Sequence, residues 1–303
     1  MYDVIIIGAG PAGITAAIYC ARAKLSALVL SKNIGGQAAL SADIQNYTGY
    51  QFVTGAELAE KFHSHLDDFP AVEHHEAPEA AAKLKRTEKG FALETDAGAY
   101  EARAVIICSG ANPRRLGVPG EKELLNKGLS YCATCDAPLF KNKDVAVVGG
   151  GNSAMDAVLQ LLKYAENVFV LTVNPELAGD AVMKEKILAE PRAKVIANAR
   201  TTAVVGSKFV EAIKYSRAGG PEQALSVQGV FVEIGWMPAT EFVDFVEKNQ
   251  LGEIKVNPAC ETSVPGVFAA GDCTDVPEKQ IIVAAGMGAV AALSAIKYLS
   301  RRK

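Results

Sequence analysis

The sequence predicts an α/β fold that contains two Rossmann-like dinucleotide-binding domains. Two glycine-rich turns carry this prediction: residues 8–13 read G-x-G-x-x-G and residues 149–154 read G-x-G-x-x-A. Each turn stands between a short apolar run, typical of a buried strand, and a segment with helical spacing of small and apolar residues. A glycine turn in this strand–turn–helix setting indicates a site for a dinucleotide.

The first turn follows an apolar strand at residues 2–8 and opens a helix that runs to about residue 23. A second strand is expected over residues 27–30. Glycines permit the tight turn and let a pyrophosphate approach the backbone, while the helix N-terminus offers N–H donors and partial positive charge. The acid that usually binds the ribose is missing, because Ser31 and Lys32 follow the second strand. The ribose hydroxyl therefore needs another partner.

The next segments are expected to complete this first domain. A helix over residues 54–69 follows from apolar side chains at helical spacing, and strands are expected at residues 81–84, 91–94 and 104–107. The proline and glycine stretch at 117–120 is typical of a crossing between domains. The histidines near the helix have no consistent ligand spacing, so we expect exposed or packed histidines and no metal site: His63, His65, His74 and His75.

The second turn repeats the opening pattern, with strands at residues 145–148 and 168–171 around a helix at 155–164. The economical interpretation is one site for a flavin and one for a second nucleotide. The alternative is a second copy that keeps its fold without its ligand. The residues expected to bind here are Gly149, Gly151, Asn152, Ser153 and Ala154.

Near the end of the chain a buried strand at residues 267–272 ends in Gly271-Asp272, and a long helix covers about 281–298. A carboxylate at a strand end can bind a ribityl hydroxyl, and a helix N-terminus can stabilise negative charge on a flavin pyrimidine. We therefore expect FAD. Its expected binding residues are Gly8, Gly10, Pro11, Ala12, Gly13, Ser31, Gly35, Gly36, Gln37, Asn46, Gly110, Gly271, Asp272, Lys279, Gln280 and Ile281.

Between the two turns lies the stretch Cys132-Ala133-Thr134-Cys135-Asp136. Two thiols at this spacing can close and reopen a small disulfide ring, and the carboxylate after them can exchange the proton that each thiolate step requires. Beside βαβ patterns this is typical of a redox pair. A zinc half-site would need a second pair, and the other cysteines stand alone. Two alternatives remain: the cysteines are buried and structural, or Asp136 is only a turn or capping residue.

The bulk composition excludes several classes. At 303 residues the chain has room for about two domains. A formal net charge of −3 gives no footprint for nucleic acid or an anionic membrane, and the apolar run at residues 4–7 is too short for a membrane span. Six cysteines in this length are no secreted disulfide framework, so we expect a cytoplasmic protein.

In this order the motifs resemble the low-molecular-weight thioredoxin reductases over essentially the full chain. The runs that carry the resemblance are residues 8–13, Gly35-Gly36-Gln37, residues 132–136, residues 149–154, Ile234-Gly235-Trp236-Met237-Pro238 and residues 269–272. Other runs are closer to the reductase part of the alkyl hydroperoxide reductase flavoprotein subunit: residues 135–141, 198–202 and 260–264. That relative has an additional amino-terminal thioredoxin-like region, which we expect this chain to lack.

The resemblance implies an FAD-binding domain over residues 1–115 and 246–303, with a nucleotide-binding domain over 116–245 inserted into it. It implies electron flow from a reduced nucleotide through FAD and the Cys132–Cys135 disulfide to thioredoxin or a similar small protein. In that family pattern Cys135 faces the flavin, Cys132 attacks the partner and Asp136 handles the proton. A homodimer whose nucleotide domain swings between two orientations is likewise implied.

The segment expected to bind the electron donor departs from the family pattern. NADPH-dependent members follow the strand after the second turn with a His-Arg-Arg run, whereas this chain has no lysine or arginine from Thr172 to Ala181. NADH-dependent relatives place a carboxylate where Thr172 stands. We therefore expect NADH rather than NADPH, or a different donor such as reduced ferredoxin or flavodoxin.

The sequence thus predicts an FAD-dependent protein-disulfide reductase of thioredoxin-reductase type. One alternative is the reductase component of a peroxide-defence system that serves a separate thioredoxin-like adaptor. Another is a non-catalytic flavin redox sensor, whose disulfide changes binding without turnover.

Overall fold

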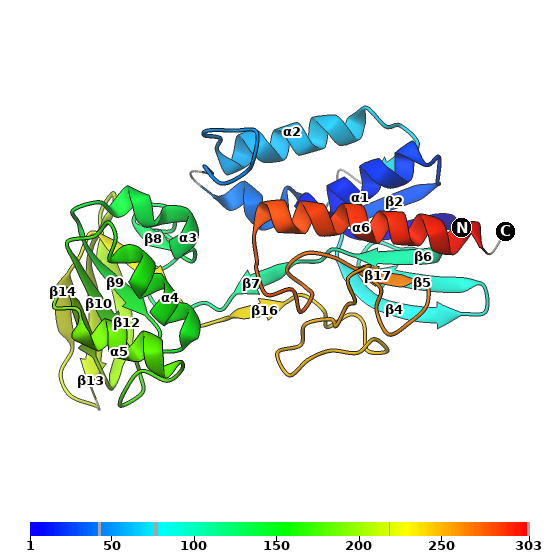
Figure 1. The fold of residues 1–303 in the computed structure, drawn as a ribbon. Coiled ribbons are helices and arrows are strands. Elements are labelled where there is room, and N and C mark those ends of the chain that lie inside the picture. The colour runs from blue at the N-terminus through cyan, green and yellow to red at the C-terminus, as the bar shows by residue number, and fades with distance from the viewer. Residues whose placement is uncertain (42–43, 75–77, 218, 302–303) are drawn as a thin grey trace. The chain divides into compact units, whose positions relative to one another are not determined.

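The computed structural model describes residues 1–41, 44–74, 78–217 and 219–301 (Figure 1). The chain divides into two compact units, one formed by Met1–Asn112 with Met237–Lys303 and the other by Pro113–Trp236. Strands β7 (Ala111–Pro113) and β16 (Trp236–Pro238) pair with each other at the two junctions. The expected α/β fold class with an inserted second unit is confirmed. The domain boundaries expected after residues 115 and 245 stay predictions.

The first unit contains a seven-stranded sheet whose centre is parallel. A hairpin of β4 and β5 continues it in antiparallel fashion beyond β6. The path runs through β3 (Val72–His74), β2 (Ala27–Ile34), β1 (Tyr2–Ala9), β6 (Ala99–Ile107), β5 (Gly90–Thr95) and β4 (Ala81–Thr87), with β17 (Val267–Ala269) beside β6.

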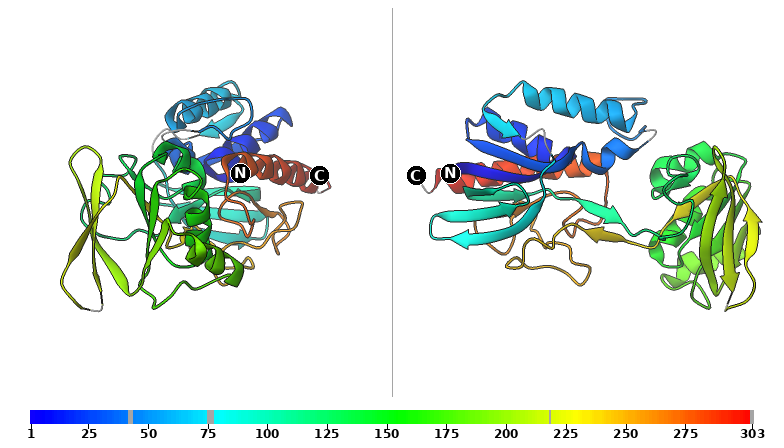
Figure 2. Two further views of the ribbon diagram at one scale, coloured as in Figure 1. Left: turned by 60° about the vertical axis from the view of Figure 1, so that its left-hand side comes forward. Right: turned by 180° about the vertical axis from the view of Figure 1, so that it is seen from behind.

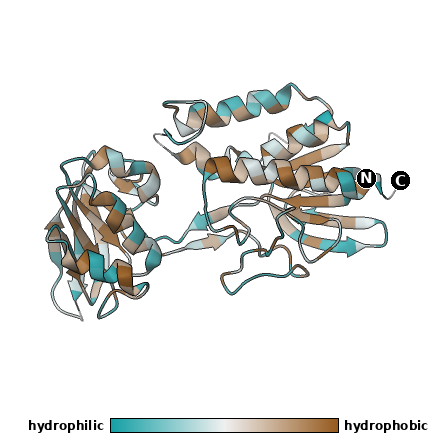
Figure 3. Ribbon diagram, in the orientation of Figure 1, coloured by the Kyte–Doolittle hydropathy of each residue, from teal (hydrophilic) through white to brown (hydrophobic). Residues whose placement is uncertain are grey.

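The apolar run at the start of the chain explains the central position of β1. Val4 and Ile6 pack on one face of the sheet with residues of α1 (Pro11–Arg22) and α6 (Ile281–Ser300), while Ile5 and Ile7 pack on the other. A strand that is buried on both faces needs continuous rather than alternating apolar residues. In Figure 3, brown marks hydrophobic residues in strands of this sheet.

Helix α2 (Gly55–Asp67) matches the helix expected over residues 54–69 and has a capping box at its start. Thr54 Oγ1 accepts from the Glu57 backbone N–H at 3.2 Å, and the Glu57 carboxylate accepts from the Thr54 N–H at 2.9 Å. These two bonds satisfy N–H groups that a helix start leaves unpaired. Leu58 and Leu66 are buried on its inner side.

Helix α6 has the length and apolar composition of a membrane span. In the structure it packs as a core helix against α1, and Ala291, Ala292 and Ala295 are fully buried. Small residues let the two helices approach closely, because a Cβ at Gly288 would lie 2.1 Å from the Ala12 carbonyl oxygen.

The second unit has a five-stranded parallel sheet between a helical layer and an antiparallel sheet (Figure 2). Residues of α4 (Asn152–Leu161) pack on the face that presents Val145 and Val147, and residues of β12 and β13 pack on the face of Ala146 and Val148. The parallel order is β11 (Ala193–Ile196), β10 (Asn167–Leu171), β9 (Asp144–Val148), β15 (Gly229–Val232) and β8 (Leu129–Ser130). The remaining elements are α3 (Ala133–Asp136), η2 (Ala137–Phe140), α5 (Ala181–Ala189), β12 (Ala199–Gly206), β13 (Val210–Arg217) and β14 (Gln223–Ser226).

The expected position of the second turn's helix was wrong by one helical turn. We expected residues 155–164, whereas α4 begins at Asn152 and ends at Leu161. Gly151 is its N-cap, as Gly10 is for α1, so the helix starts inside the glycine turn itself. Beyond Leu161 the chain turns, and the Tyr164 N–H donates to the Leu161 carbonyl at 2.9 Å.

Candidate functional site

Cys132 and Cys135 are joined as a disulfide at the start of α3, with Cα atoms 5.3 Å apart. Cys132 is the N-cap of this short helix, and its Sγ accepts from the Cys135 backbone N–H at 3.2 Å. Both residues are partly exposed. The disulfide is therefore closed in this structure and partly accessible to solvent.

Ser130 fixes the polar surroundings of the disulfide, and sequence analysis missed it. Its buried hydroxyl donates to Asp136 Oδ2 at 2.6 Å and accepts from the Cys132 backbone N–H at 3.0 Å. One hydroxyl thus connects the acid to the first cysteine. No local sequence signal marks it, because the contact depends on β8 ending beside α3.

Glu233 is a second residue that sequence analysis missed. It follows β15, and burial raises the pKa of its carboxyl to about 7, with the Asp156 carboxylate adding to the rise. A hydrogen bond from the Ala133 backbone N–H partly opposes that shift. Ala133 lies between the two cysteines, so an acid that titrates near neutral pH contacts the disulfide helix.

The other four cysteines are buried free thiols. Burial raises the pKa of Cys20 to about 12 and that of Cys260 to about 11, and it also raises the pKa values of Cys108 and Cys273. A thiol held protonated is a poor nucleophile. Cys132 and Cys135 are therefore the pair suited to disulfide exchange.

Two glycines of the opening turn, Gly8 and Gly13, have no room for a side chain. A Cβ at Gly13 would lie 1.8 Å from the Gly8 carbonyl oxygen, and a Cβ at Gly8 would lie 2.2 Å from that of Cys108. Gly8 also has φ +110°, which disfavours residues with a side chain. Pro11 and Ala12 open α1 directly after this turn.

Two expected segments from elsewhere in the chain meet this turn. A Cβ at Gly10 would lie 3.9 Å from the Gly36 Cα, and a Cβ at Gly271 would lie 3.2 Å from the Ala12 Cβ. Gly35, Gly36 and Gly271 all have positive φ. The structure therefore gathers the ends of β1, β2 and β17 around the start of α1.

Polar side chains of the expected set pair across long sequence separations. Gln37 Nε2 donates to Asn112 Oδ1, and Asn46 Nδ2 donates to Gln280 Oε1, both at 3.1 Å. Gln280 is the N-cap of α6, directly before Ile281. Ser31 does not follow this pattern, because its hydroxyl donates to the Asn33 carbonyl within its own segment.

Asp272 is half-buried, and burial raises the pKa of its carboxyl although Lys279 opposes the shift. Lys279 also pairs with Glu253 at 2.9 Å and donates to the Thr274 carbonyl. Gly110, on the loop after β6, has φ +69°, and a Cβ there would meet no atom within 4 Å. The first unit therefore holds a half-buried acid at Asp272 and open space beside the Gly110 backbone.

The second glycine turn is bound to the segment that follows β10. The Ala178 N–H donates to the Gly150 carbonyl at 2.7 Å, and the Asp180 N–H donates to Asn152 Oδ1 at 2.8 Å. Gly149 has φ +141°, and its Cβ would lie 2.1 Å from the Glu233 carbonyl oxygen. Ser153 and Ala154 lie in the first turn of α4.

Thr172 directly follows β10 and is only 2% exposed. Its Oγ1 accepts from the Asn174 backbone N–H at 3.2 Å and would lie 2.4 Å from a Cβ at Gly150. The Thr172 hydroxyl is therefore buried against the glycine turn, where it accepts a hydrogen bond from its own segment. Further along, Glu176 pairs with Lys184 of α5 at 2.6 Å.

Comparison with known proteins identifies the class. Residues 2–288 match the pyridine nucleotide-disulphide oxidoreductase family. The chain is 42% identical to an alkyl hydroperoxide reductase subunit of Escherichia coli (strain K12) over 308 residues, and 42% identical to an NADH dehydrogenase of Bacillus subtilis (strain 168) over 305. These alignments cover 100% and 99% of this chain, which spans 59% of the length of each relative.

Solved structures of similar fold indicate the same class of protein. The thioredoxin reductase of Streptococcus pyogenes MGAS5005 superposes with a TM-score of 0.93 at 35% identity, covering 99% of both chains. That of Giardia duodenalis gives 0.91 at 31% identity, again with 99% of both chains covered. The chain belongs to the pyridine nucleotide-disulphide oxidoreductase family, which confirms the resemblance and the oxidoreductase class. The family implies FAD and a nicotinamide nucleotide.

Proposed function

We propose that the chain is an FAD-dependent protein-disulfide reductase that passes electrons to thioredoxin or a small thioredoxin-like protein. The observation that carries this proposal is the partly exposed Cys132–Cys135 disulfide beside the Ser130–Asp136 pair. The other four cysteines are buried with raised pKa values, which leaves this pair as the exchange site. A cytoplasmic homodimer is part of the proposal.

The residues of the first unit fit FAD. Gly8, Gly10 and Gly13 keep the start of α1 free of side chains, as a pyrophosphate requires. Asp272 is a half-buried carboxyl for which the described residues show no hydrogen bond, and a ribityl hydroxyl would supply one. The N-terminus of α6 at Ile281 carries partial positive charge, which would stabilise negative charge on the flavin ring. When bound, FAD supplies two-electron transfer between a reduced donor and the disulfide.

The dithiol then reduces a partner by exchange. The Cys132 thiolate attacks one sulfur of the partner disulfide, which forms a mixed disulfide and releases one partner thiol after protonation. The Cys135 thiolate next attacks Cys132 Sγ, which releases the second partner thiol and re-forms the Cys132–Cys135 bond. Asp136, held by Ser130, exchanges the protons that these steps require.

The sequence relatives favour a second candidate, the reductase of a peroxide-defence system. The 42% identity to the Escherichia coli alkyl hydroperoxide reductase protein covers this whole chain but 59% of that relative. In this candidate a separate thioredoxin-like adaptor receives the electrons. The exchange chemistry at Cys132 is the same, and only the partner differs.

An anaerobic assay tests both candidates. FAD-loaded protein is mixed in separate experiments with NADH, NADPH, reduced ferredoxin and reduced flavodoxin, and flavin bleaching identifies the donor. Multiple turnover is then measured with thioredoxin and with an isolated thioredoxin-like adaptor domain. Turnover with thioredoxin supports the first candidate, and turnover with the adaptor alone supports the second. Bleaching without turnover of either partner points to a redox sensor and contradicts both.

A further inference from the structure

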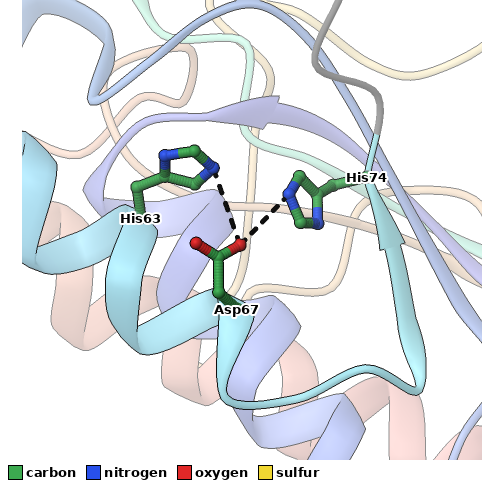
Figure 4. A group of neighbouring side chains, drawn as sticks. All are labelled: His63, Asp67 and His74. Atoms are coloured by element: carbon green, nitrogen blue, oxygen red, sulfur yellow. Dashed lines mark ion pairs between the residues drawn. The ribbon is translucent and has the colours of Figure 1, made fainter.

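Three potential metal ligands converge in the first unit (Figure 4). His63 and Asp67 stand four residues apart on α2, and His74 belongs to β3. Figure 4 shows both imidazole rings directed at one oxygen of the Asp67 carboxylate. The three ligand atoms all lie within 4.8 Å of one another.

The distances within this group fit a shared ion. His74 Nε2 and His63 Nε2 lie 3.3 Å and 3.7 Å from Asp67 Oδ1. Both separations exceed the usual 2.7–3.2 Å of an N–H···O hydrogen bond. Tetrahedral zinc with bonds of roughly 2.0–2.2 Å would place neighbouring ligand atoms about 3.4 Å apart. The two separations from Asp67 Oδ1 lie on either side of this value, and all three ligand atoms lie within 4.8 Å of one another.

The charge at this end of α2 favours a cation. Asp67 is the last residue of the helix and Asp68 is its C-cap, so two acidic side chains stand where the helix dipole is already negative. On the same helix, Lys61 Nζ lies over the Tyr50 ring at 5.9 Å. A divalent cation between Asp67 and the two histidines would offset the repulsion between these acidic side chains and the negative end of the helix dipole.

We propose that His63, Asp67 and His74 bind one zinc-class divalent transition-metal ion. Two imidazoles and one carboxylate are a ligand set that zinc uses, with a fourth position left for water. The ion would join the end of α2 to β3, the edge strand that pairs with β2. The spacing of the histidines alone did not predict this group, because His74 reaches it only through the fold.

The test uses full-length, FAD-loaded, tag-free protein with the Cys132–Cys135 disulfide kept oxidised, so that no free thiol of that pair competes for metal. Zinc is titrated against a chromogenic chelator. We expect one equivalent to bind. His63→Ala and His74→Ala should each weaken binding by at least about 10–100-fold, the cost of losing even an outer-shell partner at a metal site. Asp67→Asn, which preserves side-chain shape, should also weaken it.

His65→Ala is the matched control. His65 lies on the same helix but contacts the Phe69 ring, with centroids 5.8 Å apart, and should bind zinc like the parent. Cobalt(II) in place of zinc should give the intense visible bands of four-coordinate cobalt in the parent and in His65→Ala, and these bands should be weakened in His63→Ala, His74→Ala and Asp67→Asn. Zinc should also raise the unfolding temperature of the parent and not that of Asp67→Asn. Equal zinc affinity in the parent, His63→Ala and Asp67→Asn would overturn the proposal.

Discussion

The Glu233 carboxyl accepts a hydrogen bond from the backbone N–H of Ala133, the residue between Cys132 and Thr134. The backbone carbonyl oxygen of Glu233 lies against Gly149 of the second glycine turn. Glu233 thus contacts the disulfide helix through its side chain and the nucleotide turn through its backbone. Both contacts follow from its position directly after β15, beside β9.

Glu233→Gln should remove a pH dependence of stability. Burial raises the pKa of this carboxyl from 4.5 to about 7 in the folded chain, so folding favours the protonated form. The contribution of Glu233 is therefore full below about pH 4.5 and falls as pH rises towards 7, by at most about 3 kcal/mol. Glutamine stays neutral, so the variant should match the parent at pH 5 and exceed its stability at pH 8. Urea unfolding at both pH values measures the difference.

Glu185→Gln is the control for that measurement. Glu185 is exposed on α5 in the same unit, and the change in charge is identical. Its unfolding free energy should follow the parent at both pH values. A Glu233→Gln variant no more stable than the parent at pH 8 would show that the carboxyl is solvated.

Cys135→Ser should trap a thioredoxin-type partner as a stable mixed disulfide, and Cys132→Ser should not. In the first variant the Cys132 thiolate can still attack, while the resolving thiol is missing. The adduct is measured by non-reducing electrophoresis and mass spectrometry. A Cys108→Ser variant should turn over normally, because burial keeps the pKa of that thiol raised. The reverse trapping pattern would exchange the proposed roles of the two cysteines.

Asp136→Asn should slow partner reduction by about 10²-fold, the lower range for losing an acid–base group. The amide cannot exchange the proton, although its oxygen can still accept the Ser130 hydroxyl. Single-turnover partner reduction at several pH values measures the effect. Ser130→Ala, which keeps the acid but removes its partner, should have a smaller effect. Equal rates for the parent and Asp136→Asn would leave Asp136 with a capping role alone.

The local motifs of the fold could be predicted because glycine turns leave strong sequence signals. The strand before Gly8, the helix after it and the second copy at Gly149 all lie where the spacing placed them, apart from the earlier start of α4. The antiparallel sheet of β12, β13 and β14 was not predicted. Its residues alternate only in part, and its register depends on packing beneath the parallel sheet.

The site was predictable where chemistry is local and not where it depends on tertiary structure. Cys132, Cys135 and Asp136 are adjacent in sequence, so their relationship could be inferred directly. Ser130 and Glu233 act through contacts between separate elements. Thr172 was placed correctly at a strand end, but its burial against Gly150 depends on how the glycine turn packs.

Gly288→Ala and Gly286→Ala form a matched pair on α6 with opposite expected effects. An added methyl at Gly288 would lie 2.1 Å from the Ala12 carbonyl oxygen, so α1 and α6 must separate and the first unit should lose roughly 1–3 kcal/mol. At Gly286 the methyl meets no atom within 4 Å, and alanine should stabilise the helix by roughly 0.5–1 kcal/mol. Urea unfolding of both variants checks the prediction. Similar effects for both would mean that α6 is displaced from α1 in solution.

NADPH should be a poor donor, and Glu176 should be part of the reason. No arginine or lysine stands between Thr172 and Ala181, and Glu176 both adds negative charge and holds the Lys184 ammonium at 2.6 Å. Glu176→Ala releases Lys184 for a 2′-phosphate. A charged hydrogen bond contributes roughly 1.5–3 kcal/mol, so affinity for 2′-phosphorylated nucleotides should rise about tenfold. NADH lacks that phosphate and should bind as before.

Calorimetry with adenosine 2′,5′-bisphosphate and with ADP measures this preference without requiring turnover, and flavin reduction by NADPH and NADH measures it with turnover. Glu185→Ala is the control, since it removes the same charge from α5 at a position that does not pair with Lys184 in the described structure. If Glu176→Ala and Glu185→Ala gained affinity for the 2′-phosphate equally, the change in net charge alone would explain the effect. A parent protein that already prefers NADPH tenfold over NADH would show that cations from elsewhere in the second unit bind the phosphate, and the argument from Glu176 would be wrong.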